Sequence, residues 1–223
     1  MSGPRVFLEV FRKDLRLDLR SRDRLGHMAV FAFLVVTLLS IVVPVSKAER
    51  LSWSPALLWV VMLFTSLLGL GRTFQSETEE GAMELLVQAP VDRGWVFFGK
   101  ALASLVALFA VELWTAVLFT VFLDVDWSAG LWGCAGAGVL GAVGLAAAGT
   151  LLSAIASGAR FREFLFPVLL FPLVLPDLVF ASRITADSLA GSEIAGVSWA
   201  IFLLYDWVFV LIGFFAFDFV LED

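Results

Sequence analysis

Long apolar runs separated by short polar segments fill most of this chain. A helix needs about 20 mostly apolar residues to cross the hydrocarbon core of a bilayer. The runs are continuous and do not alternate between apolar and polar residues, which favours helices over strands. The pattern therefore predicts an all-α polytopic membrane protein with six transmembrane helices, at residues 28–45, 57–71, 96–123, 131–157, 164–181 and 197–219.

Composition supports the same class. Of the 223 residues, 61% are hydrophobic and 16% are charged. Water-soluble globular domains are closer to one half apolar, so this class is excluded. We expect residues 1–223 to form a single transmembrane domain.

The basic residues predict the orientation. Six spans place both ends of the chain on one side, and Lys and Arg collect on the cytoplasmic side of a membrane. Twelve of the fifteen basic residues fall on the side of the two ends, seven of them before the first span. Both termini are therefore predicted to be cytoplasmic, as is the loop at residues 72–94.

The segment 1–26 has the pattern of an amphipathic helix lying on the membrane surface. One narrow apolar stripe recurs at helical spacing, formed by Leu8, Phe11, Leu15 and Leu19. Arginines and aspartates between these residues would face water and lipid headgroups. The alternative is a solvated tail that only sets the topology.

The loop between the second and third spans predicts a short acidic helix. Ser76 and Glu79 have the spacing of a capping box, and Pro90 would end the helix. Three glutamates form a row beside its apolar face: Glu77, Glu80 and Glu84. Helices that lie on a membrane surface usually favour Lys and Arg, so this acidic helix is better suited to binding a protein partner. The alternative is a helix that rests on the bilayer surface.

A phosphate-binding loop is the wrong interpretation of Gly94, Gly99 and Lys100, although their spacing matches one. Ala101 stands where the hydroxyl that holds Mg²⁺ would be, and no strand precedes the segment. We expect Gly99 to allow close helix packing and Lys100 to reach toward the cytoplasmic interface. ATP and Mg²⁺ would then belong to another chain.

Three carboxylates within the predicted spans are singled out as candidates, namely Glu112, Asp177 and Asp206. Ionisable groups inside a bilayer are costly and are therefore candidates for function. Glu112 is expected near mid-membrane, Asp206 well inside the sixth span and Asp177 near the outer end of the fifth. Each could line a substrate path or gate, or be satisfied by neighbouring polar groups.

Several short motifs together carry a family resemblance. They are Gly-Leu-Gly-Arg at 69–72, the acidic segment 79–86, Pro90, Gly99-Lys100 and a proline-rich run at 166–176. The chain resembles the permeases of the ABC-2 transporter class. In length and six-span layout it is most similar to the CcmB family, the B subunit of the cytochrome c maturation haem exporter.

This resemblance implies a permease subunit of the bacterial inner membrane, which is not an enzyme by itself. Its implied partners are a cytoplasmic CcmA-like ATPase, CcmC-like and CcmD-like membrane subunits and, indirectly, a periplasmic CcmE-like haem chaperone, with no nucleic acid. The helix at 76–90 would be a coupling helix that receives the motion of the ATPase. The residues expected to dock the ATPase are Glu77, Glu80, Gly81, Glu84, Leu86 and Pro90.

Two ATPase subunits would call for two copies of this chain or for a second permease. Gly133, Ala137 and Gly141 repeat every four residues, a spacing that lets helices approach closely. They could serve a dimer or packing within the chain.

Haem is expected as a ligand that the complex handles, with no cofactor or metal held by this chain. His27 is the one histidine, and one histidine cannot supply a bis-histidine site. Two other functions stay open: an ABC-2 permease for another lipid, glycan or drug, and a scaffold that couples an ATPase to release of the haem-loaded chaperone.

Overall fold

The computed structural model describes residues 3–21, 23–43, 46–74, 77, 93–159 and 161–220. This part of the chain contains helices and no strand. The helices are α1 (Gly3–Ser21), α2 (Asp23–Val42), α3 (Lys47–Leu70), α6 (Arg93–Leu123), α7 (Leu131–Ser157), α8 (Arg162–Leu189) and α9 (Gly196–Val220). Six of them are long and apolar enough to cross a membrane, which confirms the predicted all-α, six-span class.

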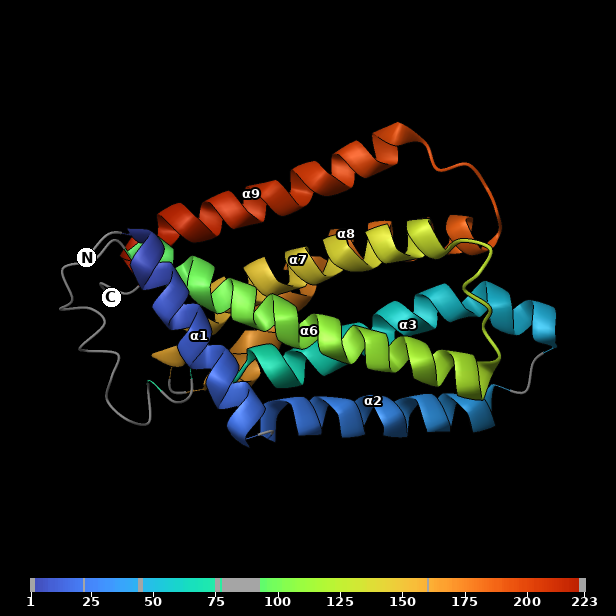
Figure 1. Cartoon of the computed structure of the whole chain (residues 1–223), viewed down its shortest axis with the longest axis horizontal. Coiled ribbons are helices and arrows are strands. Elements are labelled where there is room, and N and C mark those ends of the chain that lie inside the picture. Colours follow the sequence, from blue (N-terminus) through green and yellow to red (C-terminus); the bar gives the residue numbers. More distant parts are fainter. Residues whose placement is uncertain are drawn as a thin grey trace.

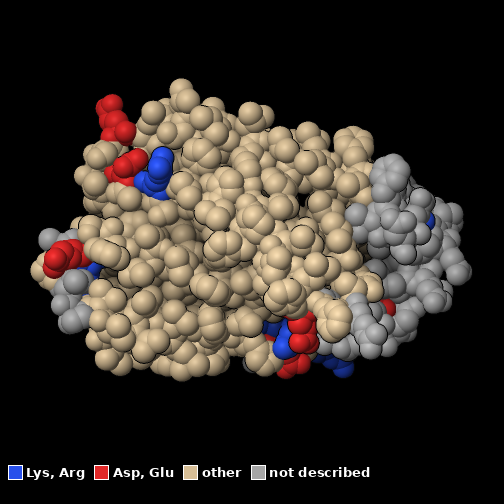
Figure 2. All heavy atoms as spheres, turned by 180° about the vertical axis from the view of Figure 1, so that it is seen from behind, with Lys and Arg blue, Asp and Glu red and all other residues tan. Residues whose placement is uncertain are grey.

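The six long helices, α2 to α9, run along the long axis of the molecule, and α1 crosses one end of this bundle (Figure 1). The described ends of the chain, in α1 and α9, lie at that same end. We call it the α1 end. Figure 2 shows that charged side chains on the visible face lie toward the two ends, with a band without Lys, Arg, Asp or Glu between them. The helices expose many large hydrophobic side chains. Such a band is the surface that a helix bundle presents to lipid.

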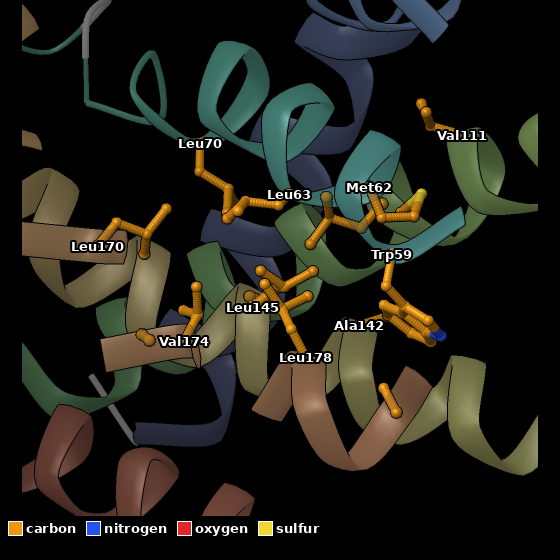
Figure 3. Packing of buried hydrophobic residues seen from close by; sticks show 14 of the residues in the cluster. Trp59, Met62, Leu63, Leu70, Val111, Ala142, Leu145, Leu170, Val174 and Leu178 are labelled. Carbon is orange, nitrogen blue, oxygen red and sulfur yellow. The ribbon is translucent and has the colours of Figure 1, made fainter. Parts of the chain in front are cut away.

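Helix α7 lies at the centre of the bundle and packs against α3, α6, α8 and α9. Its sequence is rich in Gly and Ala, and small residues let neighbouring helices approach closely. Figure 3 shows Ala142 and Leu145 of α7 beside Trp59 of α3 and Leu178 of α8. The indole Nε1 of Trp59 donates a hydrogen bond of 3.1 Å to Thr185 Oγ1. These contacts fix the rotation of α3 and α8 about α7.

Two helices extend furthest beyond the predicted spans. Helix α3 begins at Lys47, ten residues before the predicted start, because Ser46 and Glu49 form a capping box that the sequence analysis missed. Helix α8 passes through three internal prolines and continues to Leu189, beyond the predicted end at 181. Asp177 therefore lies in the interior of a helix. The expectation that it is near the outer end of its span is wrong.

Helix α1 uses a different face for packing than the apolar stripe suggested. Val6 and Val10 contact the core, and α1 packs mainly against α6. A Cβ atom on Gly99 would lie 2.9 Å from the Phe7 carbonyl oxygen, so Gly99 admits the backbone of α1. Leu8 and Leu19 of the predicted stripe are exposed. They remain available to a membrane surface, and the interfacial position of α1 stays a prediction.

Candidate functional site

A buried cluster of charges lies at the α1 end, where the chain leaves α3 and enters α6. Lys100 is 1% exposed, and its Nζ atom donates to three oxygens. The distances are 2.8 Å to Glu77 Oε1, 3.0 Å to the Thr73 carbonyl oxygen and 3.1 Å to Asp14 Oδ2. Lys100 thus joins α6 to α1 and to the first residues of the loop that follows α3.

Lys13 completes this cluster from α1. It forms an ion pair with Glu77 and a second one of 3.1 Å with Asp14. We call Lys13, Asp14, Glu77 and Lys100 the loop-base cluster. It contains two cations and two anions, as expected for buried charges, which require pairing.

Aromatic side chains of the α1 end pack against the loop-base cluster. The Lys100 Nζ atom lies 4.4 Å from the centroid of the Phe74 ring, a cation–π geometry. Phe74 in turn lies 5.9 Å from Phe217 of α9, measured between ring centroids. The cluster is therefore held to α9 as well as to α1 and α6, and its position depends on the whole α1 end of the bundle.

Electrostatics within the cluster favour ionised groups. Burial by itself raises the pKa of Glu77, but the attraction and hydrogen bonds of Lys100 and Lys13 outweigh it and hold this pKa at about 2. Burial lowers the pKa of Lys13, and Asp14 and Glu77 reverse that effect, so the pKa of Lys13 is raised above its usual value. Both groups are charged at neutral pH.

The loop-base cluster changes the interpretation of two residues. Glu77 is 3% exposed and engaged with both lysines, so this structure does not present it to a partner as the docking role requires. Lys100 was expected to reach toward the cytoplasmic interface. Its ammonium lies at the α1 end, buried among acceptors, and its place relative to the membrane surface stays a prediction. Its position inside α6 also leaves no open loop that could cradle a phosphate.

The other expected docking residues lie outside the described part of the chain. They are Glu80, Gly81, Glu84, Leu86 and Pro90. Their role in binding an ATPase stays a prediction.

Two of the three intramembrane carboxylates meet in the bundle core. Asp177 of α8 is 0% exposed and Asp206 of α9 is 2% exposed. Both point at Gly144 of α7: a Cβ atom built there would lie 2.4 Å from Asp177 Oδ1 and 2.8 Å from Asp206 Oδ1. The absence of a side chain at Gly144 creates the space that holds both carboxyl groups.

Glu112 occupies a separate place on α6. Its Oε1 atom would lie 2.2 Å from a Cβ atom on Gly138, so it fills a second glycine gap in α7. Its Oε2 atom is buried without a hydrogen-bond partner in the described structure. The structure therefore brings Asp177 and Asp206 together and places Glu112 against a different turn of α7.

The small residues of α7 pack inside the chain. Gly133 faces Ser188 of α8, and Ala137 is fully buried. Gly141 faces the indole ring of Trp59. The α7 face that carries these three residues, which the sequence analysis assigned either to a dimer or to packing within the chain, is thus in contact with α3 and α8 of the same chain.

His27 lies in the second turn of α2 at the α1 end, and its side chain is exposed. Among the described residues, no group of three or more His, Cys, Asp or Glu is placed to hold a metal ion. The neighbouring Met28 is buried against Gly69.

The sequence did not reveal that Lys13 and Asp14 belong to the loop-base cluster. It also did not reveal that Gly144 leaves the space for two carboxyl groups. One signal for Asp14 was present. Val6, Val10 and Asp14 recur at four-residue spacing, which places the carboxylate on the face of α1 that packs against α6. Gly144 carried no such signal, because α7 has many glycines.

Comparisons with known proteins agree on one family. Residues 5–222 match the family described as CcmB protein. The chain is 34% identical to heme exporter protein B of Pseudomonas aeruginosa over 118 residues, which are 48% of this chain and 53% of the relative. It is 32% identical to heme exporter protein B of Rhodobacter capsulatus over 120 residues, 54% of this chain and 55% of the relative.

The matched segments thus span about half the length of these curated relatives. Heme exporter protein B of Haemophilus influenzae matches over a longer segment, with 28% identity over 148 residues, 59% of this chain and 65% of the relative. The family match extends over nearly the whole sequence and includes all six long apolar helices. This multi-pass membrane protein belongs to the CcmB family.

Proposed function

We propose that this chain is the membrane permease subunit of an ATP-driven ABC complex that exports or handles haem during cytochrome c maturation. The name shared by its relatives, heme exporter protein B, supports the haem assignment. ATP hydrolysis would take place on a separate CcmA-like subunit. CcmC-like and CcmD-like subunits would complete the complex, which would deliver haem to a CcmE-like chaperone.

The loop-base cluster is the observation that best supports a coupled permease. Residues 78–92 connect Glu77 to α6, and Glu77 is tied to Lys100 and Lys13 by ion pairs. A force applied to this loop would therefore reach α1 and α6 directly, through buried charges that resist separation. Such a connection suits a loop that transmits ATPase motion into the membrane helices.

The proposal places the α1 end in the cytoplasm, in the bacterial inner membrane. Helix α1 alone carries five basic residues at this end. At the other end, Lys47, Arg50 and Arg183 are near the start of α3 and the end of α8. An excess of basic residues on the cytoplasmic side is the usual pattern of polytopic membrane proteins.

Docking of the ATPase would then use the acidic residues beyond Glu77. Glu80 and Glu84 carry the charge, Leu86 supplies an apolar contact, and Gly81 and Pro90 shape the segment. Two copies of this chain, or this chain with another permease, would match two ATPase subunits. Haem is the substrate of the complex in this proposal, and the exposed His27 is the one histidine that could contact it from this chain.

Affinity purification from native membranes tests the proposal. The tagged wild-type chain is compared with a Glu80→Lys, Glu84→Lys variant and with a matched control that reverses two exposed charges at the other end, Asp187→Lys with Glu193→Lys. We expect the wild type and the control to recover an ATPase together with cytochrome maturation subunits. The loop variant should lose the ATPase.

Haem staining of c-type cytochromes in a strain lacking the chain gives the second readout. The wild type and the control should restore stained c-type cytochromes, and the loop variant should not, while b-type cytochromes stay unchanged in all strains. Recovery of an ATPase with unrelated enzymes, and normal c-type cytochromes, would indicate an exporter of another substrate. Absence of any ATPase from the wild-type sample would contradict the permease proposal.

A further inference from the structure

Asp177 and Asp206 lie deep in the membrane-spanning bundle. At a rise of 1.5 Å per residue, Asp177 is about 22 Å along α8 from Arg162, and Asp206 is about 15 Å along α9 from Gly196. The hydrocarbon core of a bilayer is about 30 Å thick, so neither residue is near a membrane surface. We call the space that they share with Gly144 the carboxyl notch.

Among the described residues, no cation pairs with the carboxyl groups in the notch, and no donor outside the pair bonds to them. None of their four oxygens has a hydrogen-bond partner elsewhere in the described structure. Helix α7 carries no charged residue, and the other charged residues of α8 and α9 lie toward the helix ends: Arg162, Glu163, Arg183, Asp187 and Asp218. Tyr205 is a titratable neighbour of both carboxyl groups, and its hydroxyl donates to the Leu173 carbonyl oxygen.

Two ionised carboxylates cannot share this space at low cost. An unpaired charge in an apolar interior is strongly unfavourable, and two like charges side by side add their repulsion. A proton removes both problems, because a protonated carboxyl group donates a hydrogen bond to its neighbour and leaves a single charge spread over the pair. The paired arrangement in the notch is what such sharing requires.

We propose that Asp177 and Asp206 form an intramembrane proton-binding site. Starting from two carboxylates, the site takes one proton from water, forms one O–H bond and lowers its charge from −2 to −1. The new hydroxyl donates to the other carboxylate. A hard metal cation fits less well, since Ca²⁺ takes six to eight oxygen ligands and the notch offers four carboxylate oxygens. This inference does not depend on haem as the substrate.

The proton also connects two helices that otherwise share few contacts. Helices α8 and α9 each pack extensively against α7 and much less against each other. The hydrogen bond between Asp177 and Asp206 would hold them together across Gly144. Loss of the proton would replace that bond with repulsion, so proton occupancy would set the spacing of α8 and α9.

Infrared spectroscopy of the full chain in lipid nanodiscs tests this site. Aspartate labelled with ¹³C separates its carbonyl stretch from that of Glu112 and of every other glutamate. At neutral pH, an aspartate in water is ionised and gives no band of a protonated acid. We expect the wild type to show a protonated-aspartate band at pH 7 that an Asp177→Asn, Asp206→Asn variant loses completely. A Glu112→Gln variant is the matched control and should retain it.

Three outcomes would overturn the proposal. One is a wild-type spectrum at pH 7 without a protonated-aspartate band, a result that needs no variant and stands even where the double variant fails to fold. Another is a band that persists unchanged in a folded double variant. The third is loss of the band on addition of sodium or calcium chloride at constant pH, which would assign the notch to a metal cation.

Discussion

Replacing Lys100 with Met tests whether the loop-base cluster holds the α1 end together. The change keeps most of the side-chain volume and removes the ammonium that bonds to Glu77, Thr73 and Asp14. The carboxylates of Glu77 and Asp14 then share Lys13 as the remaining cation of the cluster. Removing one partner of a buried ion pair typically costs about 3–5 kcal/mol. We expect a loss near 3 kcal/mol, because Lys13 can still neutralise one carboxylate.

A double-mutant cycle separates the pair from its surroundings. The Lys100→Met, Glu77→Gln double variant removes both charges, so its loss of stability should be smaller than the sum of the two single losses. We expect a coupling energy of about 2 kcal/mol, within the usual range for residues in direct contact. The free energy of unfolding is measured on the full chain in mixed micelles by denaturant titration, followed by helical circular dichroism.

Lys13→Met is the matched control, because it makes the same chemical change in the same cluster. The Lys13 side chain is 48% exposed, so water screens its ion pairs and its loss should cost about 1 kcal/mol or less. The reasoning is refuted by a Lys100→Met variant that loses no more stability than Lys13→Met. A coupling energy below about 0.5 kcal/mol would refute it as well, since distant sites already reach that value.

Three further predictions concern acid stability and helix packing. The pKa of Glu77 is held at about 2, below its usual 4.5, so the stability that its ionised form contributes is complete above pH 4.5 and is lost as the pH falls toward 2. In acid titrations, the free energy of unfolding of the wild type should therefore fall by about 3 kcal/mol over this range, and that of Glu77→Gln should not. Gly144→Ala should lower the free energy of unfolding by about 1–3 kcal/mol, because the new Cβ atom would collide with Asp177. Gly196 has open space around it, so Gly196→Ala is the control and should change that free energy by less than about 0.5 kcal/mol. Gly99→Leu should separate α1 from α6 and speed amide hydrogen exchange in residues 3–21, whereas Gly26→Leu should not, because Gly26 has open space around it. Equal exchange rates in both variants would contradict the close packing at Gly99.

Local sequence patterns predicted the fold class well and the helix ends less well. Each span is an apolar run whose length must match the bilayer, so it can be recognised without knowing its neighbours. The ends of α3 and α8 were missed because polar residues continue both helices beyond their apolar runs: Ser46 and Glu49 cap the first, and the second extends past Ser182 to Leu189. Hydropathy indicates which residues can lie in the membrane, and it does not indicate where the helix that contains them begins or ends.

The candidate sites were predicted in part. Asp177 and Asp206 were recognised individually, because a carboxylate in an apolar run is conspicuous. Their meeting at Gly144 was not predicted, since it depends on how α8 and α9 are rotated about α7. Glu77 was assigned to docking by its place in an acidic row, whereas the structure buries it beside Lys100.

The sequence by itself determined that this chain forms six membrane-spanning helices, because hydropathy and the thickness of a bilayer are both local constraints. It also placed most basic residues at one end of the bundle. Only the tertiary structure decided which polar groups meet. Lys100 pairs with Asp14, 86 residues away, and two aspartates from different helices share one glycine gap. Such partners are set by the rotation and close approach of helices around α7, and the side chains that fix this packing come from every part of the chain.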